Sequence, residues 1–143
     1  MIKAMVQAVE VRDPYAARHQ RRVTELACAI GVEIRLSDDM MDAIRTAGSI
    51  HDLGMISVPA EILSKTGKLT EIEFGMIKSH PHVGYEILKE IDFPWDVARI
   101  VRQHHERTDG SGYPQGLKGE NILLEARIIG LADVVEAMAS HRP

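Results

Sequence analysis

The sequence predicts a single all-α domain, and three observations lead to that prediction. The chain has 143 residues, a length that fits one domain around one buried core. Hydrophobic residues make up 45% of the chain and aromatic residues only 4%, so the core must be aliphatic, which favours packed helices over sheets. No segment alternates polar and apolar residues as a half-buried strand would, and no internal repeat occurs.

Capping residues and apolar spacing predict the elements of the first half. Residues 1–12 place apolar side chains on one helical face. So short a stretch would hardly be stable alone, and we interpret it as a helical linker from an upstream signalling domain. A helix over 13–31 begins at an Asp-Pro pair and ends near a glycine, and another over 37–54 begins at a serine cap and ends at a glycine. Residues 58–69 are rich in turns, with one short helical turn.

The same signals predict the second half. A capping box at residues 70–73 starts a helix, and a proline in the first turn opens the next helix, over 81–88. A further helix is expected over 95–105. Residues 109–119 contain four of the eleven glycines and are therefore predicted to form a loop. A last helix is expected over 122–140.

Charge and cysteine content limit the classes of function. The formal net charge is −4, and no basic stripe offers the counterion release on which general DNA binding depends. An anionic substrate would need local positive charge, which bound metals would supply. The single cysteine, Cys28, has no partner for an internal disulfide, which suits a reducing cytoplasm. Neither a signal peptide nor a long apolar run is present, so we expect a cytoplasmic domain without membrane contact.

Asp133 is the first candidate for a functional residue. It lies in an apolar segment that predicts a helix buried almost all round. A carboxylate buried there without a partner would cost roughly several kcal/mol or become protonated. Arg127 is a poor partner, because a residue six positions away lies on nearly the opposite helical face. A structural hydrogen bond and a metal ligand both remain open for Asp133.

Seven histidines in the chain point to metal chemistry. The pair His51-Asp52 is a weak signal alone, because neighbours on a helix point about 100° apart. At a fraying helix end, however, both side chains can converge on one ion and the carboxylate can reach a second. Imidazole and carboxylate together suit Fe, Mn, Zn or similar ions. The candidate ligands, enough for two metals, are His19, His51, Asp52, His80, His104, His105 and Asp133.

This pattern resembles a known family. His51-Asp52, with a histidine upstream and an aspartate far downstream, resembles the HD superfamily of metal phosphohydrolases. The run HHERTDGSGYP over 104–114 resembles the signature of its HD-GYP branch, and similar segments cover nearly the whole chain. The resemblance implies a compact helical HD-domain bundle with a glycine-rich loop containing Gly112, Tyr113 and Pro114. That loop would either dock a partner, such as a GGDEF-type cyclase domain, or form a rigid turn at the pocket rim.

The resemblance also implies roles for the ligands. One metal would be bound by His19, His51, Asp52 and Asp133, and Asp52 would bridge to a second metal bound by His80, His104 and His105. Fe or Mn would come first as the two divalent metals, with Zn or Ni as alternatives. Family members hydrolyse cyclic di-GMP to linear pGpG, and in some cases further to GMP, and are often output domains of receiver or sensor proteins. Asp52 and His51 would form the catalytic centre, where two cations make hydroxide available near neutral pH.

The chain departs from the family pattern at three positions. Met55 replaces a lysine thought to contact the substrate phosphate, and a thioether cannot donate that charge-assisted contact, worth about 1.5–3 kcal/mol. Tyr15 stands where some members have a glutamate for a third metal, which favours two metals. Arg142 matches a substrate-binding arginine, but the chain stops at Pro143 before the expected basic residue, so we interpret its C-terminal end as truncated.

Three functions follow from these observations. The first is a metal-dependent phosphodiesterase acting on cyclic di-GMP. The second is a catalytically weak regulatory module that binds metal, nucleotide or a GGDEF partner; Met55 favours it and the complete ligand set opposes it. The third is an HD-type phosphohydrolase of nucleotides such as dNTPs, which the glycine-rich loop opposes.

Overall fold

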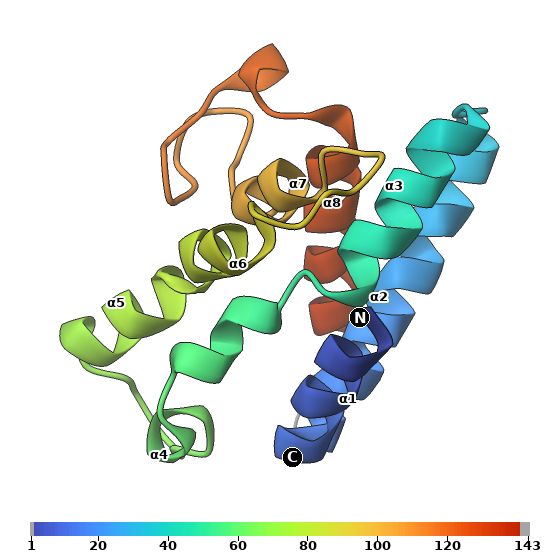
Figure 1. The fold of residues 1–143 in the computed structure, drawn as a ribbon. Helices are drawn as coiled ribbons and strands as arrows, with labels where there is room; N and C mark the ends of the chain where they lie inside the picture. The colour runs from blue at the N-terminus through green and yellow to red at the C-terminus, as the bar shows by residue number, and fades with distance from the viewer. Residues whose placement is uncertain (1, 141–143) are drawn as a thin grey trace.

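The structure is a computed structural model that describes residues 2–140 (Figure 1). Within that range the chain forms helices and short 3₁₀ turns and no strand. The all-α prediction is therefore confirmed. The elements are α1 (Ile2–Arg12), α2 (Pro14–Glu33), α3 (Asp38–Ser49), the 3₁₀ turn η1 (Leu53–Ser57), α4 (Ala60–Leu63), α5 (Glu71–Lys78), α6 (His80–Leu88), α7 (Val97–Gln103), the 3₁₀ turn η2 (Gly119–Asn121) and α8 (Leu124–Ala139).

Helix α2 is the longest element and organises the bundle. It packs lengthwise against α3 and α8, while α7 contacts both of these helices (Figure 1). Helix α6 packs on α7 and on η1, and α5 extends away from α6. Helix α1 lies along α2 and touches η1. As a result, five elements from different parts of the chain meet near the middle of the domain: α2, η1, α6, α7 and α8.

The core is aliphatic, as the composition predicts. Helices α2, α3, α6, α7 and α8 each contribute at least one side chain without exposed surface: Val23, Ile44, Leu88, Ile100 and Ile129. Burying each such side chain contributes about 1.5–3 kcal/mol relative to leaving it in water. The helices around the site are therefore fixed by packing rather than by the site itself.

The three helix starts predicted from capping residues before residue 80 are confirmed. Asp13 accepts a hydrogen bond from the Ala16 N–H at 3.1 Å, and Ser37 accepts one from Met40. Thr70 and Glu73 make both bonds of a capping box. Each cap satisfies N–H groups that the first turn leaves without helical partners.

Several predicted helix ends are wrong. Helix α3 ends at Ser49 rather than at residue 54, because the His51 ring bonds the Gly48 carbonyl that would otherwise accept an N–H of the next helical turn. Helix α2 continues through Gly31 to Glu33. Helix α7 covers 97–103 instead of 95–105, and α8 covers 124–139 instead of 122–140.

Helix α8 also differs from its prediction as a helix buried almost all round. Ala126, Ile129 and Ala132 are buried, but Leu131 is 55% exposed and Met138 is 82% exposed. The apolar composition around Asp133 therefore reflects one buried face and one exposed apolar face. Within residues 2–140, no helix combines the length and the apolar character needed to cross a membrane.

Gly54 holds η1 against α6, and a substitution there tests this contact. A Cβ at Gly54 would stand 1.9 Å from the His80 carbonyl oxygen, so the two backbones would have to separate. We expect Gly54→Ala to lower the free energy of unfolding by about 1–3 kcal/mol, measured by chemical denaturation. Gly75→Ala is the matched control, because nothing lies within 4 Å of a Cβ there. Equal stability of the two variants would contradict the close approach of η1 and α6.

Candidate metal centre

Histidine and aspartate side chains from five parts of the chain converge where the helices meet. One comes from α2, two from the turn after α3, one from the first residue of α6, two from the turn after α7 and one from α8. All seven predicted ligands are brought into one cluster: His19, His51, Asp52, His80, His104, His105 and Asp133.

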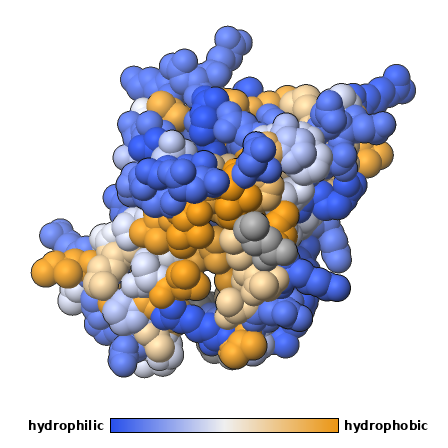
Figure 2. Space-filling view, in the orientation of Figure 1, coloured by the Kyte–Doolittle hydropathy of each residue, from blue (hydrophilic) through white to orange (hydrophobic). Residues whose placement is uncertain are grey.

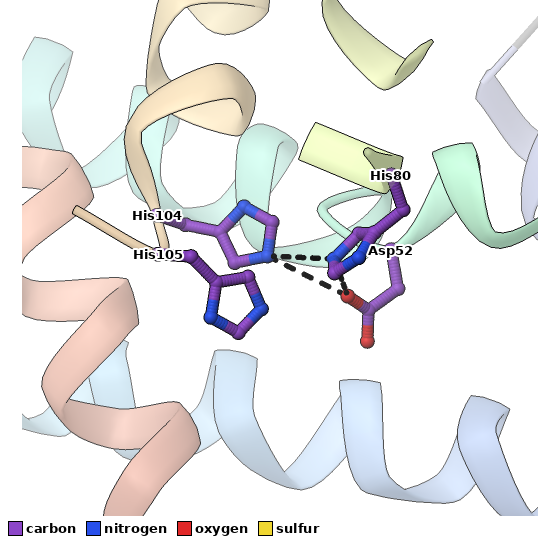
Figure 3. Close-up of side chains that lie close together, drawn as sticks. All are labelled: Asp52, His80, His104 and His105. Atoms are coloured by element: carbon purple, nitrogen blue, oxygen red, sulfur yellow. Dashed lines mark hydrogen bonds and ion pairs between the residues drawn. The ribbon is translucent and has the colours of Figure 1, made fainter. Parts of the chain in front are cut away.

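Four side chains of the cluster lie close together (Figure 3). Asp52, His80, His104 and His105 each offer a ligand atom, and these atoms all lie within 4.8 Å of one another. The Asp52 Oδ1 lies 3.2 Å from His80 Nε2 and 3.5 Å from His104 Nε2. This spacing allows all four side chains to bind a single cation.

The remaining ligands lie on the other side of Asp52. His19 Nε2 lies 2.8 Å from Asp133 Oδ1, and His51 Nε2 lies 4.0 Å from the same oxygen. The Asp52 Oδ2 lies 3.5 Å from His51 Nε2. Asp52 thus directs one carboxylate oxygen towards each group, which is the geometry that a bridging ligand requires.

Three of the histidines are oriented in the same way. The Nδ1 atoms of His51, His80 and His104 each lie within hydrogen-bond distance of the carbonyl three residues earlier, at 2.7, 2.6 and 2.5 Å. A carbonyl only accepts, so Nδ1 carries a proton and donates it, and whenever the ring is neutral its lone pair is on Nε2. The helix ends therefore fix both the tautomer and the direction of the nitrogen that faces the centre.

Asp52 is held in its charged form. Burial would raise the pKa of its carboxyl group, but the surrounding imidazoles of His51, His104 and His80 hold that pKa well below its usual value. A carboxylate that stays ionised at neutral pH is available as a metal ligand.

The histidines divide into two electrostatic classes. Burial lowers the pKa of His104, and burial together with the neighbouring His104 and His80 lowers that of His105 to about 2, so both rings are neutral. A hydrogen bond to Asp133 raises the pKa of His19. Burial would lower the pKa of His80, but its bond to Asp52 raises it. Protons and metals therefore compete at His19 and His80, because only neutral imidazole binds metal.

His51 gives an independent sign that the cluster suits a cation. Its side chain is fully buried, and its Nε2 has no hydrogen-bond partner among the residues that the structure describes. Leaving such an atom unsatisfied costs about 1–3 kcal/mol. A divalent transition metal would provide the missing partner, and imidazole with carboxylate is a donor set that such metals accept.

Comparisons with known proteins show the family of the chain. A family model described as HD domain matches residues 3–143. The chain belongs to the HD domain family. The run at 104–114 and relatives named as cyclic di-GMP phosphodiesterases place it in the HD-GYP branch, as the sequence predicted.

Two relatives and one solved structure illustrate the similarity. The cyclic di-GMP phosphodiesterase response regulator RpfG of Xanthomonas campestris is 42% identical over 99% of this chain and 38% of its own length. The 3′3′-cGAMP-specific phosphodiesterase 1 of Vibrio cholerae is 37% identical over 97% of this chain and 32% of its own length. The HDG"Y"P protein Bd1817 of Bdellovibrio bacteriovorus superposes with a TM-score of 0.75 at 21% identity, over 86% of this chain and 40% of that chain. This HD domain thus spans well under half of each of these relatives.

A cavity of about 230 Å³ opens beside the ligands of the HD domain. Met55 lines it together with Asp52 and His80, so the position expected to face the substrate does border the candidate site. Apolar residues gather across the middle of the face in Figure 2, beside α1, and the cavity is lined mainly by apolar groups. Arg142, the other predicted substrate contact, lies outside the described residues.

The glycine-rich loop lies directly on the ligands. The Tyr113 ring stacks on His105 with centroids 4.9 Å apart, and it lines the cavity. A Cβ at Gly112 would stand 2.4 Å from the His105 carbonyl oxygen, so only glycine permits this approach. Ser111 donates its hydroxyl and its N–H to Asp109, which agrees with its interpretation as a turn residue. The loop therefore forms part of the rim of the cavity.

Two buried polar residues of the HD domain were missed by the sequence analysis. Gln20, 3% exposed, accepts the Asp52 N–H through Oε1 at 2.8 Å. Glu106, 4% exposed, accepts the N–H groups of Gln115 and Leu117 and so ties the glycine-rich loop to the His104-His105 turn. In the sequence, only their positions next to candidate ligands could have drawn attention to Gln20 and Glu106. Such a position does not reveal a hydrogen-bond partner that is distant in sequence.

Gln20 should affect metal binding although it is not a ligand. We expect Gln20→Ala to weaken metal affinity by about 10–100-fold, because the Asp52 backbone loses its buried acceptor. Gln20→Glu keeps an acceptor oxygen and should retain more of the affinity. Metal titration of the two variants measures the difference, and equal losses in both would show that the hydrogen bond does not orient Asp52.

Proposed function

We propose that this HD domain is a metal-dependent phosphodiesterase that hydrolyses cyclic di-GMP to linear pGpG. The observation that carries the proposal is the position of Asp52 between two groups of ligands, at the edge of an open cavity. Relatives that cover nearly the whole chain are named as cyclic dinucleotide phosphodiesterases, which supports this substrate class.

Two divalent metals, Fe or Mn in the first place and Zn or Ni as alternatives, fit the donor set. His19, His51 and Asp133 would hold one, His80, His104 and His105 the other, with Asp52 shared. Bound there, such metals supply Lewis acidity and neutralise charge on a phosphate. The chain contributes neutral imidazoles, an ionised Asp52 and a buried floor that keeps bulk water from His51 and His104.

The shape of the surface supports a substrate with two nucleotides. Ligands of drug size occupy roughly 300–1,000 Å³, so the cavity of about 230 Å³ is too small for a whole cyclic dinucleotide. An adjoining depression of about 550 Å³ is also lined by His105, Tyr113 and Asp133. We therefore propose that the substrate lies across the cluster, with one nucleotide on each side of the Tyr113 ring.

Assays with defined metal loading test the proposal. The protein is stripped with a chelator, reloaded with Mn²⁺ or Fe²⁺, and incubated with cyclic di-GMP, 3′3′-cGAMP and a dNTP. We expect pGpG from cyclic di-GMP, with GMP as a further product on long incubation, and no product without metal. Cleavage of only the dNTP would contradict the proposal in favour of a general nucleotide phosphohydrolase.

Met55 in the cavity wall favours one other function, a regulatory module with weak turnover. Such a module would bind metal and cyclic di-GMP in equilibrium measurements but release little product. An upstream receiver or sensor domain and a GGDEF-domain protein are the proposed partners in either case, and the cytoplasm is the proposed location. A pull-down with a purified GGDEF domain, compared between the wild type and Tyr113→Ala, tests the docking role of the loop.

A further inference from the structure

Lys78 contacts two aromatic rings at the edge of the candidate site. It is the last residue of α5, and its ammonium nitrogen lies 5.2 Å from the centroid of the Tyr113 ring and 5.7 Å from that of Phe74. Contacts of a cation with aromatic faces contribute about 0.5–1 kcal/mol each at exposed sites. A lysine held by two rings loses less freedom on binding an anion than a free one does.

The Tyr113 ring connects Lys78 to the metal centre. The same ring stacks on His105 and lines both the cavity and the adjoining depression. Ile77, which precedes Lys78, and His80, two residues after it, line the cavity as well. Lys78 itself is exposed, so a ligand that extends out of the cavity over Tyr113 can reach its ammonium group.

A cyclic dinucleotide has two phosphates, and the metal centre serves only the one that is cleaved. The neutral Met55 offers no charge to the other. In the adjoining depression the cation among the described lining residues is Arg107, and one of its terminal nitrogens donates to the Glu106 carbonyl at 3.2 Å. Arg12 is the only arginine or lysine among the described residues that line the cavity itself, but both of its terminal nitrogens donate to the carbonyls of Ile56 and Val58. Its guanidinium is thus occupied in tying α1 to η1.

We infer that Lys78, positioned by Tyr113 and Phe74, binds the phosphate of the cyclic dinucleotide that is not cleaved. The inference rests on the proposed function and adds a substrate-binding residue outside the metal ligands. A charged hydrogen bond to this phosphate tightens substrate binding without taking part in the reaction at the other phosphate.

The test compares two substrates that differ in the second phosphate. Cyclic di-GMP carries it, whereas bis(p-nitrophenyl) phosphate is a diester with a single phosphate. We expect Lys78→Gln to lower kcat/KM for cyclic di-GMP by about tenfold to a hundredfold, mainly through KM, and to change kcat/KM for the simple diester less than about twofold. Lys78→Arg should recover most of the loss. Lys68→Gln, which removes an exposed lysine from the loop before α5, should leave both substrates unaffected.

Two results for Lys78→Gln would overturn the inference and leave the proposed function intact. Equal losses of kcat/KM on both substrates would show that Lys78 acts through His105 and the metals. An unchanged kcat/KM for cyclic di-GMP would show that Lys78 does not bind substrate. A wild-type protein that cleaves the simple diester but neither binds nor cleaves cyclic di-GMP would overturn the proposed function together with this inference.

Discussion

Asp52→Ala should abolish phosphodiesterase activity and lower the metal content at both positions of the centre. Asp52 directs Oδ1 towards His80 and His104 and Oδ2 towards His51. Asp133, the other carboxylate of the cluster, approaches only His105 of the second group, at 4.0 Å. Removing a shared ligand weakens both metals at once, whereas removing an unshared ligand weakens one. We expect a loss of at least about 10⁴-fold in kcat, because metals at such centres provide most of the stabilisation of charge in the transition state.

The measurement combines elemental analysis with turnover. The wild type should hold two metals per chain and Asp52→Ala fewer than one. His19→Ala is the comparison, because His19 contacts Asp133 on one side of the cluster only, and it should lose one metal. Circular dichroism establishes that each variant is folded. A folded Asp52→Ala protein with unchanged metal content would rule out the bridge.

The sequence predicts which side chains converge better than it predicts the helix ends that carry them. His51 shows why: the same ring that faces the centre also bonds the Gly48 carbonyl, and this bond coincides with the end of α3 five residues before the predicted glycine. His80 and His104 repeat the pattern at Ile77 and Val101. Helix propensities do not include a side chain that donates a hydrogen bond to a backbone carbonyl. A prediction from propensities therefore places the helix end at the next glycine.

The hydrogen-bond partners of the buried polar residues could not be predicted from the sequence, for a different reason. Gln20 and Asp52 are 32 residues apart, and their hydrogen bond exists only because α2 and α3 pack together. For Asp133, the apolar neighbours predict that the carboxylate needs a partner, but they do not identify it. The partner, His19, is 114 residues away, and the sequence names it only as another ligand of the same metal. The same apolar neighbours led to the wrong prediction that α8 is buried almost all round, because Leu131 and Met138 are exposed.

Met55→Lys should raise kcat/KM for cyclic di-GMP by roughly tenfold to a hundredfold, which corresponds to a regained charged contact of about 1.5–3 kcal/mol. The backbone at this position is fixed, because the Met55 N–H donates to the Asp52 carbonyl at 2.9 Å. The side chain lines the cavity beside Asp52 rather than the aliphatic core, so a lysine would keep its hydration and meet the substrate phosphate.

Met76→Lys adds the same charge at an exposed position of α5 and is the control for a general electrostatic effect. Thermal unfolding measured beside the kinetics separates a changed contact from a damaged fold, since a buried lysine would lower Tm and an exposed one would not. If Met55→Lys is folded and metal-loaded but has the kinetics of the wild type, this position does not govern substrate binding. The methionine would then no longer argue for a weak regulatory module. If the gain appears and is lost again in the double variant with Lys78→Gln, both lysines contribute to binding of the same substrate.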